Sequence, residues 1–257
     1  KALGKPVVIT ARGTDINLIP QFQKPREMIL EAARDADVVI TVSGALKKSL
    51  VEIGAEEKKI TVLRNGVDLE LFSPLDRNLA RNKMAVDGYV IASVGNLIPE
   101  KGHDLVIKAL PELSDATLLI AGKGPYQREL EALATSLNVA DRVRFLGSVS
   151  QTILCTLYSA ADCLVLASVR EGWPNVLLEA MACGTPAIAS NVGGVPEIIS
   201  KAEAGRILSA RTEQAVLASI RELRANLPCR KVTRAYAEQF GWQSITDSQV
   251  RLFKALK

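Results

Sequence analysis

Short apolar runs alternate with longer segments of helical periodicity along almost the whole chain. The strand-like runs fall at 6–11, 38–43, 59–64, 89–95, 116–122, 143–147, 163–168, 186–190 and 206–209. Amphipathic segments between them predict helices, among others at 26–35, 44–54, 104–113, 126–138, 151–161, 174–183, 212–226 and 231–239. This alternation is typical of parallel strands joined by crossover helices. The sequence therefore predicts the α/β class.

One segment without this rhythm divides the chain. It runs from Asn65 to Pro74 and continues as the charged stretch from Asp76 to Lys83, which we interpret as a linker. Three predicted strands precede it, too few for a complete doubly wound sheet, and six follow it. We therefore expect the later part of a first domain with the linker at 1–74, a complete doubly wound domain at 75–227, and helices at 228–257 that pack back towards the first domain. Because three strands are too few, we expect the chain to begin in the middle of the first domain. Residue 1 is Lys and no leader pattern follows it, so we expect either that the start was removed or that the chain is a fragment.

Composition narrows the class of protein. With 257 residues, 48% of them hydrophobic and 23% charged, the chain can bury a sizeable core without disulfides or metal. No apolar run approaches the roughly 20 residues of a membrane-spanning helix. The net charge of +4 is spread along the chain, which argues against a nucleic-acid partner and is compatible with a phosphate-bearing ligand.

Cysteine and histidine usage excludes further classes. The four cysteines have no C-x-x-C spacing and lie mostly in apolar runs, so we interpret Cys155, Cys163, Cys183 and Cys229 as free core thiols of a reducing cytosol. The single histidine, His103, makes a multi-histidine metal site or a Ser-His-Asp triad hard to build.

Loops after predicted strands are the candidate ligand sites, because such loops line the crevice of a doubly wound sheet. The loop from Val94 to Asp104 places Lys101 before a helix that Asp104 could cap, so Lys101 could meet a phosphate. A solvated lysine in a surface turn is an equal alternative. We expect His103 to be a loop or packing residue rather than a base.

Three glycine-bearing turns are weaker candidates. Gly122 and Gly124 form a G-x-G without the third glycine of the dinucleotide fingerprint, which favours a tight turn bordering the cleft over a phosphate cradle. The turns 146–150 and 191–197 could shape the same cleft, although each is more often ordinary turn chemistry.

The segment 168–184 carries the strongest signal. Pro174 at the first helical position and Gly184 just past the last one delimit a short apolar helix, whose first N–H groups would face the crevice. Glu171 precedes this helix, and Glu179 lies about 7.5 Å along its axis as its only charged residue. A carboxylate in such surroundings needs hydrogen-bond partners, which sugar hydroxyls would supply. The alternative is a pair of purely structural carboxylates.

The spacing of Glu171 and Glu179 resembles the E-x7-E element of glycosyltransferase family 4, the retaining enzymes of GT-B fold. The similarity covers EGWPNVLLEAMACGTPAIAS, NVGGVPEII, VGNLIPEKGHDLVIKAL, IAGKGPYQREL, VRFLGSVS and RNGVDLELFSP, in the expected order along nearly the whole chain. The resemblance implies two Rossmann-like domains across a cleft, with the second binding a nucleotide-diphospho-sugar donor and needing neither a divalent metal nor a cofactor. The fold expected is thus a complete Rossmann-like donor domain and the C-terminal part of a second such domain.

The resemblance also implies roles for individual residues. Lys101 would neutralise the donor diphosphate, Glu171 would contact sugar hydroxyls as the catalytic residue, and Glu179 would bind the ribose. Val149 in the turn 146–150 would seat the base. Sugar and phosphates would be held by the segment Gly172, Trp173, Pro174, Asn175 and Val176.

Two features depart from the family's pattern. The family commonly has Arg at the position of Asn96, a donor-binding position in this reading, so Lys101 carries more of the diphosphate charge. Most acceptor-side residues would precede Lys1, although the loop 11–17 resembles an acceptor-side cleft loop. We therefore expect the chain as given to bind donor with little or no transfer.

The resemblance implies a retaining transferase that moves a sugar to a hydroxyl acceptor in glycan, lipopolysaccharide or glycolipid synthesis. A lipid-linked acceptor, peripheral membrane contact, and a location in the cytoplasm or at the inner face of the membrane are expectations from the family. A non-catalytic module that binds nucleotide sugars or a partner protein is the alternative. A nucleotide-sugar epimerase would fit the layout, but the acid and base residues that its chemistry needs are not recognisable in this chain.

Overall fold

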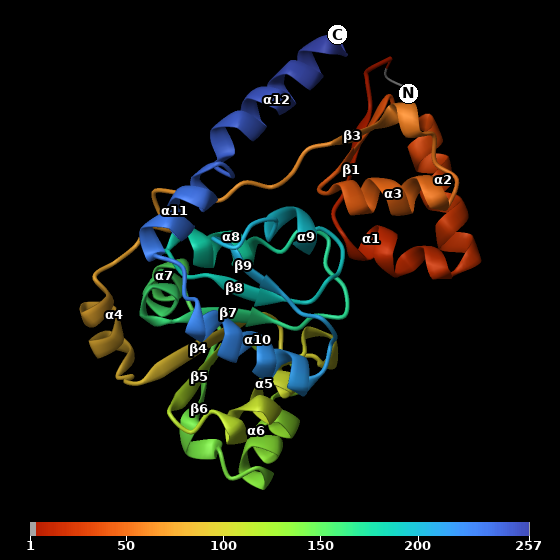
Figure 1. Cartoon of the computed structure of the whole chain (residues 1–257). Coiled ribbons are helices and arrows are strands. Elements are labelled where there is room, and N and C mark those ends of the chain that lie inside the picture. The colour runs from red at the N-terminus through yellow and green to blue at the C-terminus, as the bar shows by residue number, and fades with distance from the viewer. Residues whose placement is uncertain (1–3, 257) are drawn as a thin grey trace.

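Two parallel sheets organise the computed structural model, which describes residues 4–256 (Figure 1). Residues 1–3 and 257 lie outside the described residues; they belong to the predicted segments 1–74 and 228–257. The first sheet has the order β1-β2-β3, formed by Val8–Ala11, Val38–Thr41 and Ile60–Val62. All three strands fall within predicted runs.

Helices and short 3-10 turns accompany the first sheet. They are α1 (Thr14–Asn17), η1 (Ile19–Gln21), α2 (Gln23–Asp35), α3 (Gly44–Glu52) and η2 (Glu57–Lys59). The expected cleft loop at 11–17 contains the one-turn helix α1. Its start is fixed because the Asp15 carboxylate accepts hydrogen bonds from the backbone N–H groups of Arg12 (2.9 Å) and Gly13 (2.6 Å).

The second sheet has six parallel strands, the number that the sequence predicted, in the order β6-β5-β4-β7-β8-β9. The strands are β4 (Tyr89–Val94), β5 (Ala116–Ala121), β6 (Val143–Gly147), β7 (Cys163–Leu166), β8 (Ala187–Ala189) and β9 (Gly205–Ile207). The chain starts in the middle at β4, proceeds outward to β6, and returns to build β7 on the other side. In such sheets the ligand crevice lies outside the carboxyl ends of the two strands where the order reverses. Here these are β4 and β7.

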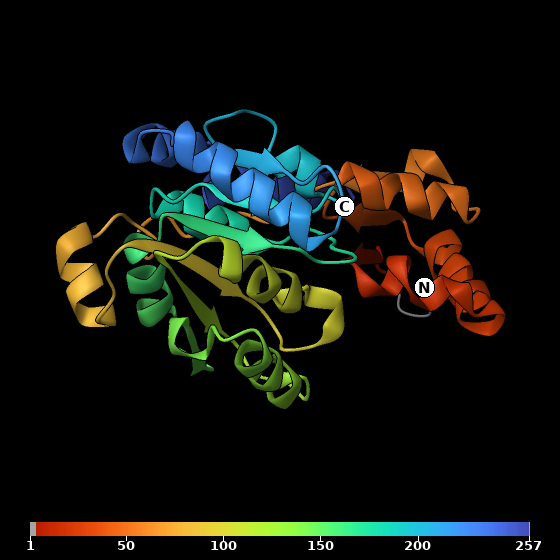
Figure 2. The ribbon, with the colours of Figure 1, turned by 60° about the horizontal axis from the view of Figure 1, so that its bottom comes forward.

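Helices cover both faces of this second sheet (Figure 2). They are η3 (Pro99–Lys101), α5 (His103–Ala109), η4 (Leu110–Glu112), α6 (Gln127–Ser136), η5 (Ala140–Arg142), α7 (Gln151–Ala160), α8 (Asn175–Ala182), α9 (Val195–Ile198) and α10 (Glu213–Ala225). The strand residues Val90, Ile91 and Ala92 are fully buried because side chains on both faces are covered. This explains why β4 is a continuous apolar run rather than an alternating one.

The charged stretch interpreted as linker from Asp76 onward is instead a helix, α4 (Arg77–Met84). Asp76 caps it by accepting a hydrogen bond from the Leu79 N–H at 2.8 Å. Its buried face packs against α7, and Arg81 forms an ion pair with the buried Asp162 at 2.7 Å. Some of the charges that suggested a solvated segment therefore bind α4 to the domain of the second sheet.

The C-terminal helices α11 (Arg230–Glu238) and α12 (Trp242–Ala255) connect the two sheets. α11 packs against α8. The residues that follow α11 contact the segment that joins the two sheets, where the Val67 N–H donates to the Phe240 carbonyl at 2.9 Å. α12 then lies beside the first sheet (Figure 1). Trp242 lines a 250 Å³ cavity together with Thr10 of β1.

The sequence also predicted that no helix spans a membrane and that the four cysteines are free thiols of the core. Within residues 4–256 no helix is long and apolar enough to cross a membrane. Cys155, Cys163 and Cys183 are buried free thiols, as predicted, but Cys229 is exposed. The prediction of a core thiol is wrong for Cys229 because it precedes α11 rather than lying inside an apolar run.

Arg230 forms hydrogen bonds to the C-terminal ends of both α7 and α8. Its guanidinium donates to the carbonyls of Ala161 (2.9 Å), Ser159 (3.0 Å) and Cys183 (3.0 Å), and to the Thr185 hydroxyl (2.8 Å). These acceptors lie where α7 and α8 end, so one side chain satisfies carbonyls that the helices leave unpaired.

We predict that Arg230→Ala lowers the free energy of unfolding by about 3 kcal/mol, because buried carbonyls lose a charged donor. Urea denaturation measures the loss. Arg221→Ala is the matched control, since its ion pair with Glu112 is more than half exposed, and it should cost under about 1 kcal/mol. Equal losses in the two variants would contradict this role for Arg230.

Candidate functional site

A cavity of about 310 Å³ lies where the carboxyl ends of β4 and β7 face the first sheet. It is lined by segments from both units: Arg12, Gly13, Thr14 and Asn17 from the first, and Asn96, Ile98, Glu100, Lys101, Arg170, Glu171, Gly172 and Trp173 from the second. The cavity therefore occupies the crevice expected from the strand order.

A buried histidine, His103, lies within hydrogen-bonding distance of both β4 and the loop that follows it. His103 Nδ1 is 2.8 Å from the Ser93 hydroxyl, and its Nε2 is 3.3 Å from the Asn96 carbonyl oxygen. Burial lowers the pKa of His103 to about 4, so the ring is neutral near pH 7. His103 is thus a packing residue, as expected. Asp104 is not the helix cap: it is the second residue of α5, and its carboxylate pairs with Lys108 at 3.0 Å.

The loop after β7 is enclosed by backbone from two other segments. A Cβ on Gly172 would lie 2.1 Å from the Arg12 carbonyl oxygen, and one on Gly193 would lie 1.8 Å from the Glu171 carbonyl oxygen. Asn17 Nδ2 also donates to the Glu171 carbonyl at 3.1 Å. Only glycine permits approaches this close, so the loop has little freedom to move.

Lys101 and Glu171 meet across the cavity in an ion pair of 2.6 Å between Nζ and Oε1. Their side chains are 24% and 12% exposed, so the pair is only partly screened by water. The structure thus brings together, from separate loops, two residues that the sequence analysis expected to contact different parts of one donor.

Two further cations line the cavity: Arg170, to which the sequence analysis gave no role, and Arg12, which it placed only within the expected cleft loop 11–17. Arg170 approaches Glu100 at 3.6 Å, and Arg12 has no carboxylate partner among the ion pairs of the described residues. Three cations therefore face two carboxylates, which favours an anionic ligand. The position of Arg12 directly after a predicted strand was the signal that could have identified it.

Glu179 is on α8, outside the cavity lining, and is largely buried. The Tyr158 hydroxyl donates to its Oε2 at 2.9 Å, and no partner for Oε1 is found among the described residues. Burial raises the pKa of Glu179 above its ordinary value of 4.5. One carboxylate oxygen is therefore still able to accept a hydrogen bond.

The ends of α8 differ slightly from the prediction. Pro174 is the residue before the first helical residue rather than the first one, because its ψ of 99° is extended. Gly184 lies just past the helix, as predicted, with a φ of 80° that favours glycine.

The other predicted residues are not all at the cavity. Asn96, Lys101, Glu171, Gly172 and Trp173 line it, whereas Pro174, Asn175, Val176, Glu179 and Val149 do not. Val149 lies in the turn after β6, separated from β4 by β5. Their roles stay predictions.

The G-x-G turn packs against the loop after β4. A Cβ on Gly122 would lie 1.8 Å from the Gly95 carbonyl oxygen, and one on Gly124 would lie 2.2 Å from that of Leu97. Neither glycine lines the cavity, which supports the tight turn over a phosphate cradle.

Hydrogen-bonding capacity remains at the same edge of the sheet. Within the described residues, the buried hydroxyls of Ser168, after β7, and Ser190, after β8, have no hydrogen-bond partner, nor does Oδ1 of Asn175 at the start of α8. Buried polar atoms usually have partners, so these three atoms leave hydrogen-bonding capacity unused close to the cavity. Residues 4–256 contain no group of three or more His, Cys, Asp or Glu side chains that could hold a metal ion.

Comparisons with known proteins match both units. The model of glycosyl transferases group 1 matches residues 76–240, and that of glycosyltransferase family 4 matches residues 1–71. A curated relative, the D-inositol 3-phosphate glycosyltransferase of Mycobacterium leprae (strain Br4923), is 34% identical over 236 residues, which cover 86% of this chain and 55% of the relative. The chain therefore spans about half the length of the curated relatives that it matches.

Solved structures agree with the fold. HepE from Anabaena, in complex with UDP and glucose, aligns with a TM-score of 0.89 and 25% identity over 98% of this chain and 72% of HepE. Sucrose-phosphate synthase from Thermosynechococcus elongatus aligns with a TM-score of 0.87 and 25% identity over 97% and 67% of the two chains. The predicted GT-B type of α/β fold is thereby confirmed.

We predict that Glu179→Gln stabilises the protein at neutral pH, because it removes a buried charge while its amide oxygen can still accept from Tyr158. The raised pKa of Glu179 sets the pH dependence: wild-type stability relative to the variant falls as pH rises from about 4.5 through the higher folded-state pKa. Melting temperatures between pH 4 and 8 measure this difference. The exposed Glu112→Gln is the control, and a pH-independent difference for Glu179→Gln would refute the expectation.

Proposed function

The chain belongs to the glycosyl transferases group 1 family, and we propose that it forms the donor-binding part of a retaining enzyme. That enzyme transfers a sugar from a nucleotide-diphosphate sugar to a hydroxyl acceptor. The observation that carries the proposal is the Lys101–Glu171 pair across a cavity at the carboxyl ends of β4 and β7. Family membership agrees with the resemblance found in the sequence.

The diphosphate is assigned to the cationic part of the cavity. Lys101 would release Glu171 and pair with the phosphates, and Arg12 and Arg170 would add charge that Asn96 does not supply. Glu171 would then accept hydrogen bonds from sugar hydroxyls. Because the leaving group is a nucleoside diphosphate, fixed positive charge stabilises the negative charge that develops on it.

The rest of the donor follows the segments next to the cavity. The first N–H groups of α8, together with Gly172 to Val176, would hold the sugar and phosphates. The unpaired oxygen of Glu179 would accept from a ribose hydroxyl, and the turn containing Val149 would seat the base. We assign no protein nucleophile, and Glu171 acts by contacting and positioning the sugar.

The proposed reaction needs no metal or cofactor, since side chains of the chain itself meet the diphosphate charge. The acceptor contributes a hydroxyl, and a lipid-linked acceptor at the inner face of the membrane belongs to the same proposal. The relatives named as acting on D-inositol 3-phosphate support a hydroxyl-bearing acceptor. Their partial overlap with this chain makes donor binding the part to test first.

We predict that one nucleoside diphosphate selectively raises the melting temperature. A ligand at a hundredfold excess over its dissociation constant stabilises the folded state by about 2.7 kcal/mol. A thermal-shift series with UDP, GDP, ADP and their sugar conjugates, followed by calorimetry, measures this. Lys101→Ala should lose most of the shift, whereas Lys108→Ala, whose lysine is outside the cavity lining and pairs with Asp104, should keep it. No shift with any nucleotide would overturn the proposal.

We predict that Glu171→Gln separates sugar binding from diphosphate binding. The variant frees Lys101, so the nucleoside diphosphate should bind at least as tightly as in wild type. The additional affinity contributed by the sugar should fall about tenfold, because a charge-assisted hydrogen bond is lost. Calorimetry with the best nucleotide and its sugar conjugate measures both. Glu100→Gln, the other carboxylate of the cavity, is the control; equal changes for the two ligands would favour the structural, non-catalytic alternative.

A further inference from the structure

Two of the buried thiols face one another between neighbouring helices. Cys155 lies on α7 and Cys183 directly follows α8, and the Cys183 thiol donates to Cys155 Sγ at 3.7 Å. The side chains are 4% and 0% exposed, respectively. Each sulfur atom therefore has the other as a close neighbour in a dry environment.

The same two helices are joined a turn away by the Tyr158–Glu179 hydrogen bond of 2.9 Å. Arg230 holds the backbone at the ends of both helices by donating to the carbonyls of Ser159 and Cys183, each at 3.0 Å. With the backbone tied on both sides, the two sulfurs stay opposite each other. A disulfide has an S–S bond of about 2.05 Å, so its formation must bring the two sulfurs closer than the 3.7 Å that separates them in the reduced protein.

We propose that Cys155 and Cys183 are the site of an intramolecular disulfide formed by reaction with a peroxide. The sulfur of Cys155, as thiolate, attacks one peroxide oxygen; the O–O bond breaks, and a sulfenic acid and one water form. Cys183 then loses its proton and attacks the sulfenic sulfur, so the S–O bond breaks and a second water leaves. Two thiols and one hydrogen peroxide thus give one disulfide and two waters.

The two cysteines differ in a way that fits these roles. The hydrogen bond from Cys183 lowers the pKa of Cys155 to about 6, so Cys155 is the better nucleophile. Cys155 is also slightly the more exposed, and its thiol donates a hydrogen bond to the Ser73 carbonyl at 3.3 Å, in the segment between the two sheets. Cys183 has its pKa raised by the same hydrogen bond and by burial, as expected for the thiol that reacts second.

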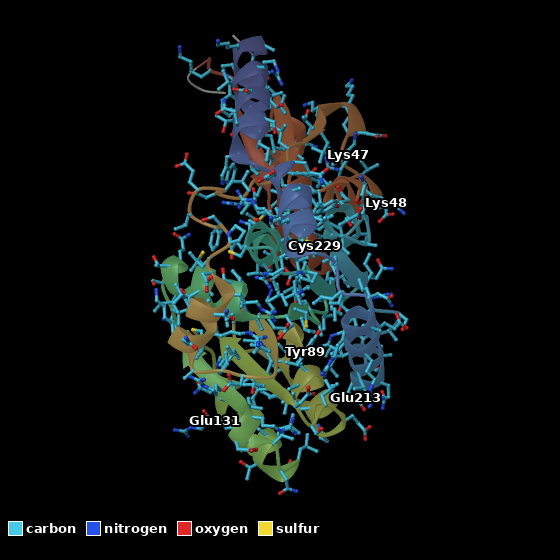
Figure 3. The ribbon with its side chains drawn as sticks, turned by 60° about the vertical axis from the view of Figure 1, so that its left-hand side comes forward. Lys47, Lys48, Tyr89, Glu131, Glu213 and Cys229 are labelled. Atoms are coloured by element: carbon cyan, nitrogen blue, oxygen red, sulfur yellow. The ribbon has the colours of Figure 1, made fainter. Side chains whose placement is uncertain are left out.

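The other two cysteines serve as internal controls. Cys163 is fully buried in β7, where burial raises its pKa to about 12. Cys229 is exposed before α11 (Figure 3), so it reports whether peroxide has reached the protein surface. Neither has a sulfur neighbour among the described hydrogen bonds.

The experiment treats the reduced, folded chain with hydrogen peroxide, removes the peroxide with catalase, unfolds the protein and alkylates the remaining thiols. The intact mass should show that two thiols escape alkylation, and peptide mapping should find Cys155 linked to Cys183. Cys155→Ser and Cys183→Ser should abolish the link, whereas Cys163→Ser and Cys229→Ser should keep it. The oxidised wild type should also melt several degrees higher than the reduced form, because the link constrains the unfolded chain.

The proposal is overturned if Cys229 is fully converted to its sulfenic acid, trapped with dimedone, while Cys155 and Cys183 remain alkylatable. It is also overturned if the 155–183 link forms only after urea unfolding, since the folded geometry would then play no part. Both outcomes are read from the wild-type chain, so they do not depend on the folding of any variant.

Discussion

Close backbone contact at glycines is the constraint on which the cavity depends. The loop after β7 passes between two other segments, and its carbonyl and N–H groups touch their backbones directly. A Cβ on Gly172 would overlap the Arg12 carbonyl, and one on Gly193 would overlap that of Glu171. Because interiors are close-packed, a side chain at Gly172 would push the two sheets apart, and one at Gly193 would push the loop after β8 away from the loop after β7. The position of Glu171 is therefore set by packing between backbones rather than by its own side chain.

The charges inside this rigid frame are matched to each other before any ligand enters. Lys101 pairs with Glu171, and their limited exposure makes the attraction stronger than that of a surface pair. A diphosphate must compete with the Glu171 carboxylate for Lys101, but it carries more negative charge. The same exchange would release Glu171 to accept hydrogen bonds from a sugar. One ion pair can thus couple recognition of the two parts of a donor.

Much of this arrangement follows from patterns in the sequence. Alternating apolar runs predicted both parallel sheets, and the carboxyl-end rule placed Lys101 and Glu171 on the correct edge. Local charge was harder to interpret: α4 was mistaken for a linker because its arginines pair with Asp162, a residue distant in sequence. Arg12 directly follows a predicted strand, so the same rule could have placed it at this edge. The ion pairs between α4 and Asp162 join segments distant in sequence and leave no periodic signal, so no pattern within one segment could predict them.

The segment that joins the two sheets is tied to both ends of α8. Before the helix, Trp173 Nε1 donates to the Asn65 carbonyl at 2.9 Å. Past its other end, Arg234 donates to the carbonyls of Phe72 (2.6 Å) and Ala182 (2.8 Å). A shift of one sheet against the other must therefore strain contacts at the ends of the helix that carries Glu179. Interfaces with discrete packing transmit such shifts rather than absorb them, so a change in the relative position of the sheets would reach the proposed donor site through α8.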